Sequence, residues 1–249
     1  MNETIQTQIN HRTIREFTDE KISSQTLNQL LEVANSTASS NHLQSFSIIR
    51  VVDENLMKEI SDIANQKYLA RVPELLIFIV DQYRNHQIGL EQGQQLEATS
   101  DMNSFTQGFT DACLAAQNVV VAAESLGLGT VFFGSILNDV PKLVELLQLP
   151  QLTFPVVGVG IGFANQSPQL KPRLPITLKV FTDTYEKKND YLDLIKEYDS
   201  VLNQYYDLRD TNNRVDTFRD QIVNKLSLSN PKRAYIAHHI KNQGFKIDG

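Results

Sequence analysis

Four segments of the chain have the apolar pattern of β-strands. Residues 75–80 are continuously apolar, which is typical of a strand in a sheet covered on both faces. Residues 46–52 are rich in β-branched side chains and predict a second strand, and residues 128–134 predict a turn followed by a short third strand. Residues 154–163 predict a fourth strand, whose glycines allow the close approach of another backbone.

Other segments have the spacing of helices. Ser23 is a suitable N-cap for one helix, and residues 53–65 predict a second, amphipathic one. Residues 109–126 form the strongest helical pattern, which is apolar nearly all round and ends at Gly127. We therefore expect this helix to be buried centrally. Pro141 lies near the first turn of a further predicted helix.

These elements interleave without a strict strand–helix–strand alternation. They predict an α+β fold with a mixed central β-sheet sandwiched by helices. Residues 85–105 are polar and predict a mobile or irregular excursion, and beyond residue 184 Tyr, Asp, Asn, Lys and Arg dominate in helical patterns. We predict a core domain of residues 1–184 and a helical C-terminal extension of residues 185–249 that packs over a surface.

Composition narrows the class of protein. The 249 residues include 23 Lys and Arg against 29 Asp and Glu, which gives a net charge of −6. This sign argues against nucleic-acid binding and against anionic membranes. The N-terminus lacks a signal-peptide pattern, and no apolar run reaches membrane-spanning length, so we expect a cytoplasmic protein. The single cysteine, Cys113, excludes an internal disulfide and is expected to be an inert core thiol.

Basic residues cluster at two places on this acidic chain. Residues 11–15, His-Arg-Thr-Ile-Arg, precede the first predicted core helix, and residues 171–173, Lys-Pro-Arg, form a proline-stiffened loop. A hydroxyl-rich loop, Ser39-Ser40-Asn41, follows that helix. Taken singly, each segment is most often a solvated surface. Together they supply what a flavin mononucleotide needs: cations for a phosphate and hydrogen-bond donors for the ring edge.

Two other motifs, a glycine-rich run and a pair of adjacent histidines, do not predict a binding site. The glycines at 158, 160 and 162 lie inside a strand and no helix opens after them, so they do not match a dinucleotide-binding fingerprint. His238 and His239 are adjacent on a helix, which turns their side chains about 100° apart, and no carboxylate cluster accompanies them. No metal site is predicted.

The flavin-type motifs occur in one order and at characteristic distances, and they resemble those of the nitroreductase superfamily. More narrowly, the chain resembles the NADPH-preferring oxygen-insensitive nitroreductases and their NADPH-flavin reductase relatives, from about residue 8 to the C-terminus. The segments that carry the resemblance are residues 11–15 with Phe17, Ser39-Ser40, Gly127-Leu128-Gly129, residues 171–175 and Asn212-Asn213-Arg214.

The resemblance implies FMN as the cofactor. Arg15 matches the cation at the flavin N1/O2 edge, Gln66 an amide at the pyrimidine edge, and Gly134 an amide of close approach near N5. Lys171 and Arg173 match a phosphate clamp. The complete set of FMN-binding residues that it implies is His11, Arg12, Thr13, Ile14, Arg15, Ser39, Ser40, Gln66, Phe132, Phe133, Gly134, Ser135, Lys171, Pro172 and Arg173.

The resemblance also implies residues on the substrate side. Arg209 matches the arginine that holds the 2′-phosphate of NADPH, Arg214 is its neighbour, and Arg15 and Asn41 line the same side. Two positions depart from the family pattern: Ser135 stands where relatives often have a second glycine, and Phe132 where they often have Tyr. Both departures bear on substrate preference.

The activity that the resemblance implies is a ping-pong reaction. NADPH, with NADH as an alternative donor, passes a hydride to N5 of FMN, and nitroaromatics, quinones or related acceptors then take two electrons. No catalytic side chain is required, because solvent can supply the proton. The family forms homodimers that build each FMN site from both subunits, with the C-terminal arm over the partner.

Three alternatives remain open from the sequence. The first is an NAD(P)H-flavin reductase whose acceptor is free flavin. The second is a non-catalytic flavin-binding protein for storage or redox sensing, although the presence of Arg209 argues mildly against it. The third is a structural protein that binds no flavin and is colourless when purified.

Overall fold

The computed structural model describes residues 1–209 and 216–247, and for residues 206–209 it describes the backbone. The chain divides into two compact units, Met1–Pro168 with Pro231–Gly249, and Gln169–Asn230. The domain boundary predicted after residue 184 falls inside the second unit. The C-terminal residues belong to the first unit because Ile240 and Phe245 are buried in its core.

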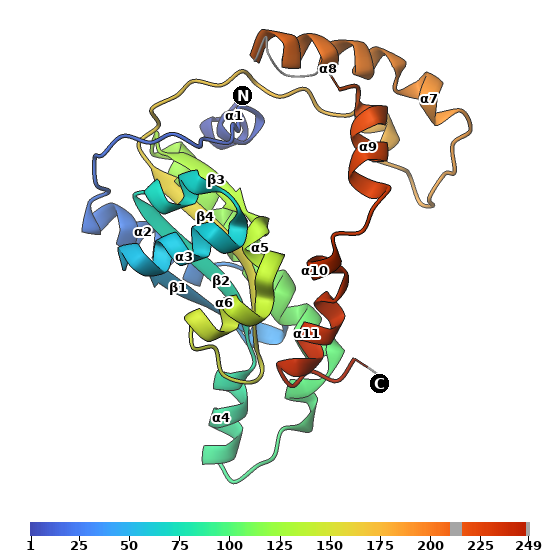
Figure 1. The fold of residues 1–249 in the computed structure, drawn as a ribbon. Helices are drawn as coiled ribbons and strands as arrows, with labels where there is room; N and C mark the ends of the chain where they lie inside the picture. The colour runs from blue at the N-terminus through green and yellow to red at the C-terminus, as the bar shows by residue number, and fades with distance from the viewer. Residues whose placement is uncertain (210–215, 248–249) are drawn as a thin grey trace. The chain divides into compact units, whose positions relative to one another are not determined.

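An antiparallel sheet forms the centre of the first unit, with its strands in the order β1-β2-β4-β3 (Figure 1). Every residue of β2 is buried, as its continuous apolar pattern predicts. An isolated parallel bridge joins Thr13 to Thr130 at the β3 edge. The strands are β1 (Phe46–Val51), β2 (Glu74–Asp81), β3 (Gly129–Phe133) and β4 (Thr153–Gly162).

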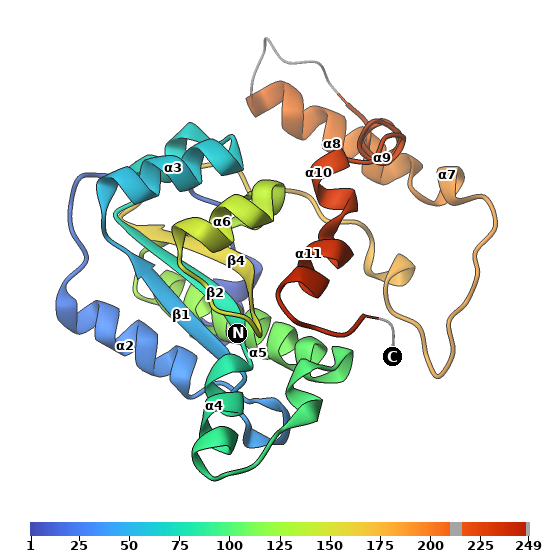
Figure 2. The same ribbon diagram turned by 60° about the horizontal axis from the view of Figure 1, so that its bottom comes forward.

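Helices lie on both faces of this sheet: α3 and α6 on one, and α2 and α5 on the other (Figure 2). This arrangement confirms the predicted α+β fold with a sheet sandwiched by helices. The sheet was predicted to be mixed, whereas its named strands all pair antiparallel. The N-cap predicted at Ser23 is present, since its side chain accepts from the Thr26 amide. Asp53 caps α3 in the same way, because its side chain accepts from the Leu56 amide. The helices of this unit are α1 (Glu3–Ile9), α2 (Ser24–Asn35), α3 (Glu54–Ala64), α4 (Tyr83–Glu91), α5 (Met102–Ser125), α6 (Val140–Leu146), α10 (Pro231–Ala234) and α11 (Ile236–Asn242), with 3₁₀ turns η1 (Ser40–His42), η2 (Lys67–Arg71), η3 (Glu97–Ser100) and η4 (Gly134–Asp139).

The segment expected to be irregular, residues 85–105, is mostly helical. It contains most of α4, all of η3 and the first turn of α5, which begins at Met102 instead of residue 109. Asp101 caps α5, because its Oδ1 accepts from the Ser104 amide at 2.7 Å. The ring of Phe105 is buried and packs edge-on against Phe245, with 5.0 Å between ring centroids. The Asp101 cap and this buried contact outweigh the polar composition.

Helix α5 ends as predicted, at a glycine in the left-handed conformation. Gly127 has a φ of 77°, and the Leu128 amide donates to the Ala123 carbonyl at 3.0 Å. The expectation of burial on nearly all faces is wrong, because the sheet and α2 cover only part of the helix. Cys113 and Leu114 are exposed in this chain, so Cys113 is not a core thiol.

The glycines of β4 make room for neighbouring side chains. The sequence had suggested that they allow the close approach of another backbone. A Cβ on Gly160 would lie 2.9 Å from side-chain atoms of Phe133 and Val72. Residues 163–175 follow β4 without forming a helix, which excludes the dinucleotide-binding motif at this place.

The second unit, Gln169–Asn230, contains three helices among its described residues beyond Tyr185. It has a small apolar cluster of Tyr198, Leu202 and Tyr205. The buried Asp199 accepts from the Phe218 amide at 2.8 Å and pairs with Arg219 Nε at 2.6 Å, which joins α8 to α9. Its elements are η5 (Ile176–Leu178), α7 (Tyr191–Leu194), α8 (Lys196–Arg209) and α9 (Phe218–Leu226).

None of the helices in the described ranges is long and apolar enough to cross a membrane.

Candidate flavin site

The N-terminal basic segment lies beside β3 and the end of α5. The Ile14 amide donates to the Thr130 carbonyl at 2.8 Å, next to the Thr13–Thr130 bridge. His11 Nδ1 lies 2.7 Å from Glu124 Oε1 on α5. The backbone of the segment and its histidine are therefore both fixed to the core.

The two arginines of this segment have no carboxylate partner among the described residues. Arg12 is exposed, and its Nη1 donates to the Asn10 carbonyl at 3.4 Å. Arg15 is half-buried, and within residues 1–209 and 216–247 it makes no hydrogen bond or ion pair. Two guanidinium groups whose charge no protein group neutralises suit an anionic ligand.

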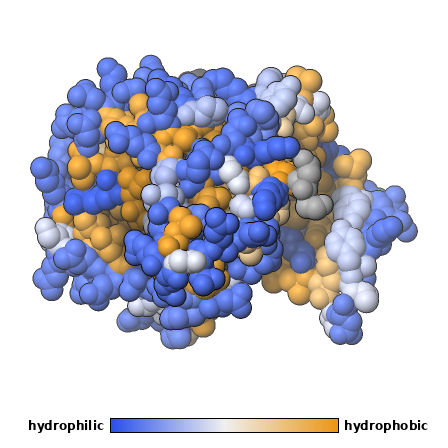
Figure 3. Space-filling model, turned by 90° about the horizontal axis from the view of Figure 1, so that it is seen from below, coloured by the Kyte–Doolittle hydropathy of each residue, from blue (hydrophilic) through white to orange (hydrophobic). Residues whose placement is uncertain are grey.

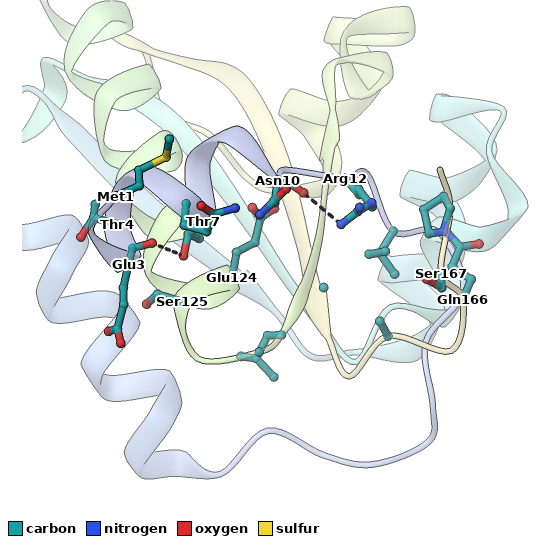
Figure 4. A pocket seen from close by; sticks show the side chains of 17 residues that line it. Met1, Glu3, Thr4, Thr7, Asn10, Arg12, Glu124, Ser125, Gln166 and Ser167 are labelled. Atoms are coloured by element: carbon teal, nitrogen blue, oxygen red, sulfur yellow. Dashed lines mark hydrogen bonds between the residues drawn. The ribbon is translucent and has the colours of Figure 1, made fainter. Parts of the chain in front are cut away.

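A cavity of about 940 Å³ opens beside this segment. Figure 4 shows side chains of α1 on one side of it, Gln166 and Ser167 on the other, and Arg12 between them. Of the residues predicted to bind FMN, Arg12 and Ile14 line it. Its lining is largely polar, which fits a hydrophilic part of a ligand better than an aromatic ring.

The Ser39–Asn41 loop is held by a carboxylate that the sequence analysis did not single out. Asp111 of α5 is buried, and it accepts from the Ser40 amide at 3.0 Å and from the Ser45 amide at 3.3 Å. Between these two anchors, Asn41 has a positive φ of 52° and its side chain is exposed. Asp111 therefore sets the position of a strained, exposed loop.

Gln66 carries a polar atom without a partner. Its Oε1 is buried and accepts no hydrogen bond, and Ser135 Oγ is in the same condition. The two segments are neighbours, because the rings of Tyr68 and Phe133 lie 5.6 Å apart and Asn138 donates to the Ala64 carbonyl at 3.3 Å. Buried oxygens without partners cost free energy, so a ligand that donates to them is favoured here.

Neither the backbone conformation at Gly134 nor the packing around it requires a glycine. Its φ is not in the left-handed region, and a Cβ built on it would meet no atom within 4 Å. Its carbonyl accepts from Arg233 Nη2 of α10 at 2.6 Å, and Lys232 binds Asp139 at the far end of η4. The adjacent Phe132 is partly exposed, whereas Phe133 is fully buried.

The remaining predicted residues belong to the second unit or lie outside the described residues. In the second unit, the Pro172 carbonyl accepts from Tyr198 Oη at 3.4 Å, which anchors the Lys171–Arg173 loop. The predicted convergence of this loop with residues 11–15 stays a prediction. The side chain of Arg209 and the whole of Arg214 lie outside the described residues.

The described residues fit FMN by their chemistry. The unpartnered Gln66 Oε1 suits the imide N–H of an isoalloxazine ring, the open space at Gly134 suits a flat ring over the backbone, and Arg12 suits a phosphate. Glu124, Asp111 and Arg233 are functional-site residues that were not predicted from the sequence. A signal was present for the first two, because an isolated carboxylate in a helix as apolar as residues 109–126 is seldom buried without a partner.

Known proteins are similar to this chain over nearly its whole length. The nitroreductase family model matches residues 9–163, and the model of the C-terminal domain of that family matches residues 171–248. An FMN reductase (NADPH) of Bacillus subtilis is 35% identical over 248 residues, which covers 98% of this chain and 99% of the relative. An oxygen-insensitive NADPH nitroreductase of Salmonella typhimurium is 36% identical over 246 residues, with 98% and 99% covered.

Comparison with solved structures shows the same likeness. The solved structure of NfrA2 from B. megaterium superposes with a TM-score of 0.93 and 33% identity over 100% of both chains. This chain belongs to the nitroreductase family. Its likeness extends over the full length of its relatives, including the C-terminal domain.

Proposed function

We propose that this protein is an FMN-dependent oxidoreductase that takes electrons from NADPH and reduces small acceptors, among them nitro compounds, quinones and flavins. The observation that carries the proposal is the buried, unpartnered Oε1 of Gln66 beside the segment 132–135, in a chain similar over its full length to an FMN reductase and a nitroreductase. Such an atom needs a donor that the protein does not provide.

The residues of the chain bind and tune the cofactor. FMN, when bound, supplies a centre that accepts a hydride from NADPH and delivers two electrons to the acceptor. Gln66 would accept from the ring edge, and the missing side chain of Gly134 would leave room for the ring against the backbone. Arg15 would place a positive charge where the reduced ring becomes negative, which favours reduction. The phosphate would bind residues 11–13 of the first unit. The part of Lys171 and Arg173 in a phosphate clamp stays a prediction.

A homodimer belongs to the same proposal. Support comes from apolar side chains that the first unit leaves exposed, such as Leu114 and Leu126, whose exposed fractions are 46% and 52%. On the face seen in Figure 3, apolar side chains reach the surface between polar ones. A second copy of the chain would cover such surface and complete the site with its own Ser39–Asn41 loop. Sedimentation analysis tests this, and a monomer at micromolar concentration would contradict it.

The first experiment is the absorption spectrum of the purified protein. We expect a yellow protein that NADPH bleaches under anaerobic conditions and that a nitroarene, a quinone or added FMN recolours. A yellow protein that neither NADPH nor NADH bleaches would indicate a flavin-binding protein without turnover. A colourless protein that does not bind added FMN would contradict the proposal.

The second experiment replaces Gln66 by leucine. Because the apoprotein makes no hydrogen bond to Gln66 Oε1, the stability of the apoprotein should not fall. The affinities for FMN and for riboflavin should both fall about tenfold, since the lost hydrogen bond is to the ring. Unchanged affinities would show that Gln66 does not contact the flavin.

The third experiment replaces Arg209 by alanine. If its guanidinium binds the 2′-phosphate, the KM for NADPH should rise about ten- to a hundredfold while the KM for NADH changes little. Lys196→Ala is the matched control, because Lys196 is an exposed cation at the start of the same helix. Equal effects on both dinucleotides would remove the assigned role.

A further inference from the structure

We propose that Glu124 is a positioning residue for the cofactor phosphate, because its carboxylate fixes the ring of His11 with Nδ1 as a donor and leaves Nε2 for the phosphate. This inference rests on the proposed function. It concerns a carboxylate on α5 that lies outside the basic segment itself.

The Glu124 carboxylate is hydrogen-bonded both to Thr130 of the core and to His11 of the basic segment. Its Oε1 accepts from His11 at 2.7 Å and from Thr130 Oγ1 at 2.6 Å. The side chains of His11 and Glu124 are 29% and 12% exposed, so solvent screens this pair less than a surface pair. Thr130 also accepts from the Ile14 amide through its carbonyl. Rotation of the Glu124 side chain would therefore break two hydrogen bonds at once.

The position of Glu124 in the chain explains how its carboxylate can orient His11. It lies in the last turn of α5, where Gly127 ends the helix and β3 begins two residues later. The carboxylate therefore stands between the end of α5 and the first residues of β3. Both elements are fixed by the core, so the orientation of His11 is fixed with respect to the sheet.

Ring chemistry then links phosphate binding to a proton. With Nδ1 committed as a donor to Glu124, Nε2 carries a hydrogen only when the ring is protonated. A phosphate accepts hydrogen bonds, so it selects the protonated ring, whose charge Glu124 balances. Glu124 lines the cavity beside the basic segment together with Met1, Glu3 and Arg12, so the charges of Glu3 and Arg12 also act near this place.

The experiment measures flavin binding by apoprotein through quenching of flavin fluorescence. Glu124→Ala removes the hydrogen bonds and the charge, whereas Glu124→Gln keeps an acceptor oxygen and removes the charge alone. Glu145→Gln is the matched control, since Glu145 is exposed on α6 and makes the same change in net charge. Riboflavin, which has no phosphate, is the matched ligand.

The expected result separates FMN from riboflavin. Glu124→Ala should weaken FMN binding about tenfold and leave riboflavin binding unchanged. For Glu124→Gln the loss should be smaller than for Glu124→Ala, because an acceptor oxygen for His11 Nδ1 remains. Nitrogen NMR of His11 in the wild-type apoprotein should show hydrogen on Nδ1.

Three results would overturn the inference. The first is equal weakening of FMN and riboflavin binding, which would mean that Glu124 has a purely structural role. The second is unchanged FMN binding in both Glu124 variants. The third is hydrogen on Nε2 alone in the neutral ring of His11. If Glu124→Ala does not fold, Thr130→Val tests the same network, with a smaller loss expected for FMN alone. Wild-type protein that binds neither flavin would refute the proposed function itself, so the two failures are distinguishable.

Discussion

Gly129 of β3 lies directly opposite Gly162 of β4 in the register of the sheet. Neither glycine has a positive φ, so packing accounts for their missing side chains. A Cβ on Gly129 would lie 2.8 Å from Ile14, and one on Gly162 would lie 2.5 Å from Pro73 and 2.9 Å from Phe17. The glycine pair therefore makes room for the two apolar residues that flank Arg15 and fix its backbone against the sheet.

Replacing Gly129 by alanine should displace Ile14 and with it the basic segment. Three atoms of the β-branched Ile14 side chain lie within 2.9 Å of the added carbon, so the clash cannot be relieved by a flexible chain end. We expect a loss of about 1–3 kcal/mol in the free energy of unfolding, measured in urea, together with weaker FMN binding. Wild-type stability in this variant would contradict the packing role of the pair.

Gly134→Ala should have the opposite profile. Because no atom lies within 4 Å of the added carbon, the apoprotein should unfold at the same urea concentration as the wild type. FMN binding should nevertheless weaken, since a methyl group would occupy space that the ring needs. Fluorescence titration with FMN checks this, and unchanged affinity would place the ring elsewhere.

Asp111→Asn should loosen the Ser39–Asn41 loop. The asparagine keeps one acceptor oxygen but points an amide group at the second backbone N–H, which leaves that buried donor unpaired. We expect a loss of about 1–3 kcal/mol of stability and a higher KM for the electron acceptor. Asp62→Asn, at an exposed position on α3, is the control for the change in charge. A variant with unaltered stability and KM would show that the carboxylate is dispensable.

The attachment of α10 to η4 should depend on pH. The hydrogen bond from Lys232, at 2.9 Å, lowers the pKa of Asp139. A carboxyl group whose pKa is lower in the folded state stabilises the fold above its unfolded pKa, and the stabilisation is lost as pH falls through the folded pKa. Lys232→Met should therefore cost at most about 1 kcal/mol at pH 7, because the pair is partly exposed.

At acidic pH the difference between this variant and the wild type should disappear. As pH falls through the lowered pKa of Asp139, its carboxyl group takes up a proton and no longer pairs with Lys232. Urea unfolding at pH 7 and pH 3 measures both differences. A cost of Lys232→Met that is equal at the two pH values would mean that the lysine acts through packing alone.

The candidate site could be predicted in part, and the reason differs from segment to segment. Residues 11–15 and 171–173 stand out as basic clusters on an acidic chain, so local composition is enough to find them. Glu124 and Asp111 act across more than sixty residues of sequence, on His11 and on the Ser40–Ser45 loop, and a single chain offers no local pattern for such pairs. The helical structure within residues 85–105 was not predicted, because the prediction rested on the polar composition of the segment and did not use Asp101 as an N-cap.

The sequence by itself determined the strands, most helices, the left-handed end of α5 at Gly127 and the residue types that suit a flavin phosphate, because these depend on periodicity, backbone conformation and charge within a few residues. Only the tertiary structure decided which oxygens are buried without partners, which face of α5 is exposed and which carboxylate fixes His11. These properties depend on desolvation and on contacts between distant segments, and both arise only when the chain packs.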